Sequence, residues 1–178
     1  MACPNGTMSK TEVEELLRRY CVEVGNKLLV GYGLQLQPGD LSHLLAGRDL
    51  SLLGIIGFTG RHIAGTLVVG ATKEPIEASQ PPNSTSRDWV AELANQLLGG
   101  VKNRVLSHGI EFYAVPPTVV SGAHLAPVTS RSNFEPVTFS CAGGIICLWI
   151  EIEVSDPYLL SPATDAAEIP DEGDVLLF

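Results

Sequence analysis

The chain has 178 residues, of which 45% are hydrophobic and 17% are charged, a length and composition typical of one soluble globular domain with its own core. Its 20 acidic and 11 basic side chains give a net charge of −9 at pH 7. Nucleic-acid backbones are bound by clustered Lys and Arg, so this charge argues against nucleic acid and favours a protein or a small molecule as the partner.

The N-terminal residues show no basic stretch followed by an apolar core, which an export signal would need. The longest apolar run, Gly143 to Ile150, is too short to span a bilayer. We therefore expect a cytoplasmic protein that does not enter a membrane.

The sequence shows no pattern that would hold a metal or a cofactor. No Cys-x-x-Cys pair occurs, and no histidine lies at ligand spacing from a cysteine, so we expect three thiols in the core and one near the N-terminus. The glycines at positions 54, 57 and 60 lie on a predicted strand without a following Lys-Ser/Thr, so we expect them to be structural. No cofactor is therefore expected in this chain. The four cysteines are Cys3, Cys21, Cys141 and Cys147.

Apolar side chains recur at three- and four-residue steps over residues 13–28, the period of an amphipathic helix. Ser9 can open this helix, and Gly31 can end it. The segment Leu34 to Asp40 alternates apolar and polar residues before a Pro-Gly pair, which predicts a short strand and a turn.

Two branched apolar segments, Leu50 to Phe58 and Ile63 to Val69, are separated by Thr-Gly-Arg-His. They predict an antiparallel hairpin with its turn near Gly60. The next segment, Lys73 to Thr85, contains three prolines and no periodicity, which predicts an exposed connection without a helix.

Arg87 to His108 shows the strongest helical pattern of the chain, with Gly109 as its stop. One broad face of this helix is apolar and should pack on a sheet. The opposite side gathers five residues in one exposed strip. The apolar face comprises Trp89, Val90, Leu93, Ala94, Leu97, Leu98, Val101 and Val105, and the strip comprises Asp88, Glu92, Asn95, Gly99 and Lys102.

The C-terminal half predicts further strands at Ile110 to Val115 and Val119 to Ser121. Pro136 to Ser140 and Ile145 to Val154 predict a second hairpin around an Ala-Gly-Gly turn. Within it, the alternation at residues 148–153 predicts that Leu, Ile and Ile face the core while Trp, Glu and Glu face the solvent.

The summed pattern predicts an α+β fold, with two long helices packed on an antiparallel β-sheet. We expect a flexible N-terminus at residues 1–10, one domain at 11–156 and an acidic, disordered tail at 157–178. The tail closes on the apolar segment Val175 to Phe178. Two interpretations of it stay open, a docking peptide for a partner or a solubilising tail.

Glu92 and Asn95 lie one helical turn apart in the exposed strip, as Glu-x-x-Asn. Glycine costs a helix interior about 1 kcal/mol relative to alanine, so Gly99 in the same strip is informative. Its missing side chain leaves room for the surface of another protein. A bare Glu-x-x-Asn is common on solvated helices, so the motif alone does not decide between a site and an ordinary surface.

The residues around the motif add a family resemblance. Ala-Glu-Leu-Ala-Asn-Gln-Leu-Leu-Gly at 91–99, followed by Lys102, resembles the signature helix of the CheC, CheX and FliY phosphatase family. Leu-Gly-Ile-Ile-Gly-Phe-Thr-Gly at 53–60 resembles the family's first hairpin, and Pro-Thr-Val-Val-Ser-Gly at 117–122 with His124 resembles the segment after the catalytic helix. From residue 11 to residue 155 the order of elements is similar to the CheX branch.

Two features of the family bear on this chain. CheC-type members carry two signature helices, whereas here the first long helix offers only Glu23-Val-Gly-Asn26, a poor second copy, so one active site is expected, as in CheX. Members usually place a further helix before the signature helix. The proline-rich segment Lys73 to Thr85 is predicted to lack it.

The resemblance implies a phosphatase that acts on a phosphorylated CheY-like response regulator in chemotaxis or related two-component signalling. Asn95 would position the attacking water, since a carboxamide can both accept and donate a hydrogen bond. Glu92 would dock to a lysine of the regulator, and Asp88, Gly99 and Lys102 would complete the binding surface. The lysine, the phosphorylated aspartate and a Mg²⁺ ion would belong to the partner, and a homodimer is the family's suggestion.

Two rival functions stay open. The chain could be a non-catalytic binding or adaptor module of the same fold in a signalling or motility complex. It could also be a structural subunit that pairs through exposed strand edges. The joint presence of Glu92, Asn95 and Gly99 favours the enzyme.

Overall fold

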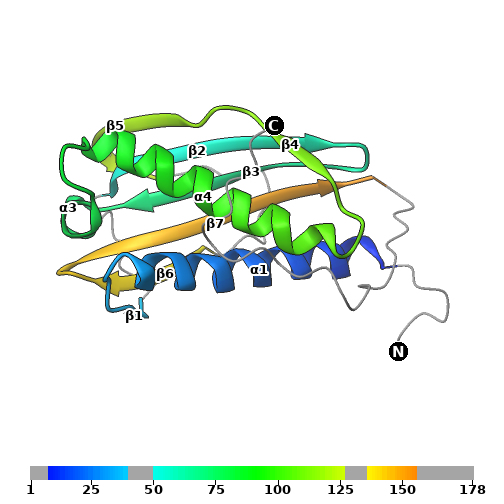
Figure 1. The fold of residues 1–178 in the computed structure, drawn as a ribbon, viewed down its shortest axis with the longest axis horizontal. Coiled ribbons are helices and arrows are strands. Elements are labelled where there is room, and N and C mark those ends of the chain that lie inside the picture. Colours follow the sequence, from blue (N-terminus) through cyan, green and yellow to red (C-terminus); the bar gives the residue numbers. More distant parts are fainter. Residues whose placement is uncertain (1–7, 40–49, 127–135, 156–178) are drawn as a thin grey trace.

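A computed structural model describes residues 8–39, 50–126 and 136–155. Over these residues a seven-stranded antiparallel sheet runs in the order β1-β6-β7-β3-β2-β4, and β5 also pairs with β2. Two long helices and one short helix accompany it, so the predicted α+β fold is confirmed (Figure 1). The elements are α1 (Lys10–Gly31), β1 (Gln37–Pro38), β2 (Leu50–Gly60), β3 (Ile63–Ala71), α3 (Lys73–Ser79), α4 (Ser86–Leu106), β4 (Phe112–Ala114), β5 (Thr118–Leu125), β6 (Val137–Cys141) and β7 (Gly144–Val154).

Helix α1 begins and ends where the sequence predicts. The Glu12 N–H donates to Ser9 Oγ over 3.3 Å, and the Ser9 N–H donates to Glu12 Oε2 over 2.7 Å, a reciprocal capping box. The apolar side of the helix packs into the main core, which it shares with α4 and one face of the sheet. The strand predicted after α1 is confirmed only in part, because β1 has two residues.

Both predicted hairpins form. Strands β2 and β3 pair from Leu52↔Ala71 to Thr59↔Ala64. The β6–β7 turn is built from Ala142 at φ 48° and Gly143 at φ 79°. Two central residues with positive φ are the geometry that joins antiparallel strands tightly, because it matches their right-handed twist.

The prediction that residues 73–85 form an exposed connection without a helix is wrong, because α3 occupies Lys73–Ser79. Pro75 lies in the first turn of this helix, where a backbone N–H has no intrahelical partner and a proline is therefore tolerated. The helix also buries Pro75, Ile76 and Ser79 against the rest of the protein. Tertiary burial thus stabilises a segment whose own pattern is too short to be periodic.

The prediction that Trp149 faces the solvent is also wrong, since its side chain is only 6% exposed. It lies on the face of the sheet opposite to the main core, where it joins a second apolar cluster with Leu50, Leu53, Val68 and Cys147. Strands β2, β3 and β7 are apolar along continuous runs, and such runs are typical of strands buried on both faces. The glutamates of β7 lie farther along the strand, at residues 151 and 153, and are not buried.

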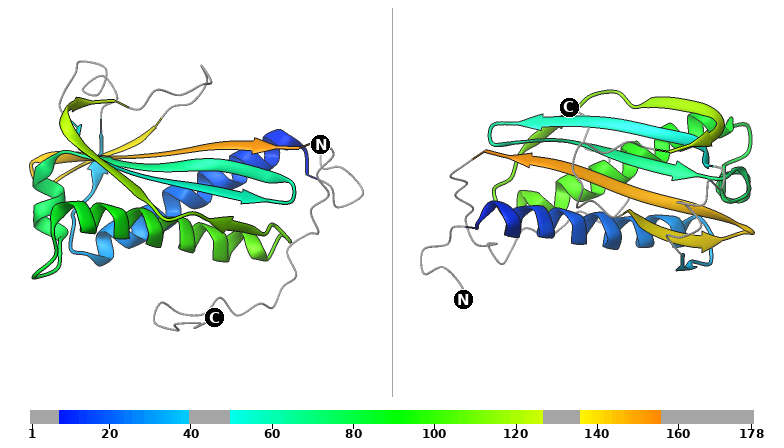
Figure 2. Two further views of the ribbon diagram at one scale, coloured as in Figure 1. Left: turned by 90° about the horizontal axis from the view of Figure 1, so that it is seen from above. Right: turned by 180° about the vertical axis from the view of Figure 1, so that it is seen from behind.

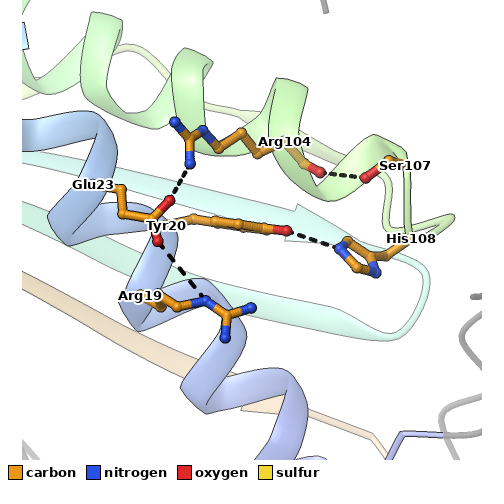
Figure 3. Close-up of polar contacts among 6 residues, drawn as sticks. All are labelled: Arg19, Tyr20, Glu23, Arg104, Ser107 and His108. Atoms are coloured by element: carbon orange, nitrogen blue, oxygen red, sulfur yellow. Dashed lines mark hydrogen bonds and ion pairs between the residues drawn. The ribbon is translucent and has the colours of Figure 1, made fainter. Parts of the chain in front are cut away.

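The two long helices are joined by a polar cluster between the middle of α1 and the C-terminal end of α4 (Figure 3). Glu23 forms ion pairs with Arg104 and Arg19. The Tyr20 hydroxyl is 2.9 Å from His108 Nε2, and the guanidinium groups of Arg19 and Arg104 lie 5.6 and 5.5 Å from the Tyr20 ring centre. Glu23 is therefore engaged in holding the helices together.

This cluster predicts a loss of stability in acid. Burial, and secondly the positive charge of Arg19, lower the pKa of His108 from its ordinary value of 6.5. The folded state therefore prefers the neutral ring, and its contribution is full above pH 6.5 and lost as the pH falls below that value. We expect the melting temperature to fall more between about pH 7.5 and 5.5 in the wild type than in His108→Gln. Equal pH slopes in the two proteins would contradict this assignment.

Candidate functional site

Helix α4 starts at a well-formed cap that fixes the position of its first turn. Thr85 Oγ1 accepts from the Asp88 N–H over 3.2 Å and donates to Asp88 Oδ2 over 2.5 Å. A carboxylate in the first turn is also favoured by the helix dipole. Asp88 is exposed, as predicted, and its carboxylate is tied to the cap.

The eight residues predicted for the apolar face of α4 are all buried, which confirms the helix orientation. The helix lies across β2 and β3 on one side of the strands (Figure 1 and Figure 2, left). The Trp89 indole N–H donates to Ser79 Oγ over 3.0 Å, which links α4 to α3. The helix missed by the sequence prediction therefore supports the start of α4.

The opposite face of α4 carries all five residues predicted for the site. Asp88, Glu92, Asn95 and Gly99 are exposed, and Lys102 is half-buried with its ammonium 5.8 Å from the centre of the Tyr113 ring. Glu92 and Asn95 are one turn apart, a spacing that places their Cβ atoms roughly 5–6 Å from each other. The Asn95 side chain makes no hydrogen bond to any residue in the described part of the chain.

Two adjacent glycines of α4 have different surroundings. A Cβ atom added at Gly99 would meet nothing within 4 Å, whereas one added at Gly100 would lie 2.5 Å from Val24 Cγ1 of α1. Internal packing therefore explains Gly100, where α1 and α4 approach each other closely. It does not explain Gly99, whose open surroundings fit the prediction that another surface approaches there.

Glu92 is held by two residues that sequence analysis missed. The Gln96 amide donates to Glu92 Oε1 over 2.6 Å, and the Tyr32 hydroxyl donates to Gln96 Oε1 over 2.8 Å. The four-residue spacing of Glu92 and Gln96 is a signal in the sequence, because such residues are neighbours on a helix. No comparable signal points to Tyr32, which lies 64 residues away from Gln96.

Beside the exposed strip, a groove of about 490 Å³ runs between α1 and α4. Tyr32, Gln96 and Gly99 line it together with residues of both helices. Gly99 belongs both to the lining of this groove and to the exposed strip, so the two surfaces meet along α4.

The described residues contain neither a metal-binding cluster nor a reactive cysteine. Within residues 8–39, 50–126 and 136–155, no three His, Cys, Asp or Glu side chains are grouped so as to hold a metal ion. Cys21, Cys141 and Cys147 are buried free thiols, and burial raises the pKa of Cys21 to about 12 and that of Cys147 to about 11. Such thiols stay protonated and are weak nucleophiles. No helix in the described part of the chain has the length and apolar character needed to cross a membrane.

The model of a protein family described as the chemotaxis phosphatase CheX matches residues 52–142. This match spans most of β2, all of β3, α3 and α4, and strands β4, β5 and β6. The chain belongs to the CheX family. A search of curated proteins gave no match.

Solved structures of CheX and CheC-like proteins share the fold. A CheX chemotaxis protein from Vibrio vulnificus is 21% identical, with a TM-score of 0.63, over 78% of this chain and 97% of that one. A CheC-like superfamily protein from Shewanella sp. PV-4 is 24% identical, with a TM-score of 0.62, over 78% and 97%. The CheX of a CheX–CheY–BeF3–Mg²⁺ complex from Borrelia burgdorferi is 19% identical, with a TM-score of 0.52, over 78% and 96%.

Proposed function

We propose that this member of the CheX family is a phosphatase that hydrolyses the aspartyl phosphate of a CheY-like response regulator. The observation that carries the proposal is the joint exposure of Glu92 and Asn95 on a helix whose other side is fully buried. The existence of a CheX–CheY complex in Borrelia burgdorferi supports the choice of partner. The aspartate, a lysine and the Mg²⁺ ion would be supplied by that partner.

In the proposed reaction, Asn95 positions a water molecule in line with the phosphorus atom. An aspartyl phosphate is labile, so placing the water accounts for most of the catalysis required. The water oxygen bonds to phosphorus as the bond between phosphorus and the aspartate oxygen breaks. Both protons of the water end on the inorganic phosphate, and the aspartate is released as its carboxylate. The Asn95 carboxamide, which has no partner among the described residues, can accept from the water and donate to the phosphoryl group.

Glu92 contributes docking in this proposal. Its carboxylate lies one turn before Asn95 and can form a charge-assisted hydrogen bond with a lysine ammonium of the regulator. That contact would fix the rotation at which α4 meets the partner. Glu92 therefore acts mainly on the affinity for the regulator, whereas Asn95 acts on turnover.

The proposal is tested by mixing a trace of this protein with a larger amount of a phosphorylated CheY-like regulator from the same genome in the presence of Mg²⁺. We expect many equivalents of inorganic phosphate to be released per protein molecule, well above spontaneous decay. If no candidate regulator loses its phosphate faster while several bind the protein, the chain is a binding module and the phosphatase assignment is wrong.

Replacing Gly99 by alanine is predicted to stabilise the protein and to weaken its activity. Gly99→Ala should raise the free energy of unfolding by up to about 1 kcal/mol, because alanine favours the helix and meets no atom within 4 Å. It should also raise KM for the phosphorylated regulator, because the new methyl group occupies the space into which the partner fits. Thermal unfolding and initial rates measure the two effects.

Gly100→Ala is the matched control for this pair. Its Cβ atom would press on Val24, so we expect a lower melting temperature and little change in KM. Should Gly99→Ala leave KM unchanged, the partner does not approach this part of α4.

A further inference from the structure

We infer that Gln96 and Tyr32 are positioning residues that hold the Glu92 carboxylate in the orientation needed to dock the regulator. This inference rests on the proposed function, and it adds a role for two residues outside the Glu-x-x-Asn motif. It is carried by two hydrogen bonds in series, from the Tyr32 hydroxyl to Gln96 and from the Gln96 amide to Glu92.

The first residue of these two hydrogen bonds, Tyr32, packs against the core of the protein. Tyr32 caps the C-terminus of α1, where its N–H donates to the Leu28 carbonyl over 3.2 Å. Its ring packs edge-on against Trp89, with ring centres 4.5 Å apart and planes at 88°. Trp89 is 3% exposed and donates to Ser79 of α3. The Tyr32 hydroxyl therefore occupies a position set by three helices.

The chemistry of the groups fixes the orientation of the Gln96 amide. An ionised carboxylate only accepts hydrogen bonds, so the Gln96 nitrogen must face Glu92. Its oxygen then faces Tyr32, which can donate from its hydroxyl. Both ends of the amide are satisfied in one rotamer. Rotation of Gln96 away from this rotamer would break both bonds.

The hydrogen bond from Gln96 leaves one of the two carboxylate oxygens of Glu92 available for docking. Oε1 is engaged by Gln96 over 2.6 Å, whereas Oε2 has no hydrogen bond to any residue in the described ranges. A glutamate on an exposed helix otherwise samples several rotamers, and ordering it on binding lowers affinity. Holding Glu92 in advance presents Oε2 to the incoming lysine at a defined place beside Asn95.

The test is the kinetics of Tyr32→Phe and Gln96→Met on the phosphorylated regulator. Tyr32→Phe removes only the hydroxyl and keeps the ring against Trp89. We expect KM to rise by about two- to tenfold in each variant, the range that the loss of one hydrogen bond produces, with kcat unchanged. Tyr20→Phe is the matched control, since it also removes a hydroxyl that links α1 to α4, at His108. It should leave KM as it is.

A double-mutant cycle separates positioning from general structure. In a Glu92→Ala background, Tyr32→Phe and Gln96→Met should have no further effect on KM, because the group that they position is gone. Equal effects in both backgrounds would show a structural role and overturn the inference.

The outcomes also separate this inference from the proposed function. If the wild type turns over the regulator and Glu92→Ala raises KM while Tyr32→Phe and Gln96→Met do not, the inference fails and the phosphatase stands. If Glu92→Ala leaves KM unchanged, the docking role of Glu92 and the inference both fail, while the phosphatase activity itself stands. If the wild type releases no phosphate, both are wrong.

Discussion

Replacing Asn95 by alanine is expected to reduce turnover of the phosphorylated regulator by roughly a hundredfold or more, the usual loss when one well-placed hydrogen-bonding group of an active site is removed. The side chain is exposed and makes no hydrogen bond to a described residue, so its removal should not lower the melting temperature. Regulator binding should change little, because the docking contact is assigned to Glu92. Phosphate release under saturating regulator, together with thermal unfolding, measures both effects.

The matched control is Asn26→Ala on α1. Asn26 is exposed on a helix and belongs to the poor second copy of the motif, whose Glu23 is engaged with Arg104. We expect this variant to keep full turnover, which would also show that the chain has one active site. Retention of wild-type turnover by Asn95→Ala, or its loss in Asn26→Ala, would contradict the assignment of the site to α4.

Gly54→Ala is expected to lower the free energy of unfolding by about 1–3 kcal/mol, because it overpacks the contact between β2 and α4. A Cβ atom at this position would lie 2.8 Å from both the carbonyl oxygen and Cγ1 of Val90. The carbonyl belongs to the helix backbone, so the contact is relieved only if α4 moves from the sheet. Since Val90 precedes Glu92 by two residues, turnover should fall as well.

Gly57→Ala on the same strand is the control for this prediction. Its Cβ atom would approach Val115 Cγ2 at 3.3 Å, a side-chain atom that can move, so a much smaller loss is expected. Urea unfolding of the two variants gives the comparison. If Gly54→Ala is as stable as Gly57→Ala, the close approach of β2 to α4 does not position the helix.

The exposed and buried faces of α4 could be predicted from the sequence because both are local properties. A period of 3.6 residues assigns each side chain to a face whatever the helix packs on. The eight buried residues and the positions of Glu92, Asn95 and Gly99 therefore agree with the structure. The ends of α1 and the two hairpin turns were predictable for the same reason, since caps and turns are encoded by a few neighbouring residues.

Helix α3 and Trp149 were predicted wrongly because burial by distant segments decides them. A seven-residue helix with Pro75 in its first turn has no periodicity that can outweigh three prolines, and its stability depends on what it buries. The alternation in β7 likewise shows which side chains share a face. It does not show that the second face also carries an apolar cluster around Leu50 and Val68.

The sequence by itself determined the fold class, the two faces of α4 and the exposed positions of Glu92 and Asn95, because these depend on local periodicity. Only the tertiary structure decided how Glu92 is held. Tyr32 reaches Gln96 across 64 residues of sequence, and Gly100 packs closely against Val24 of α1. Such contacts arise where two helices cross on a sheet, and no spacing along a single chain segment encodes them.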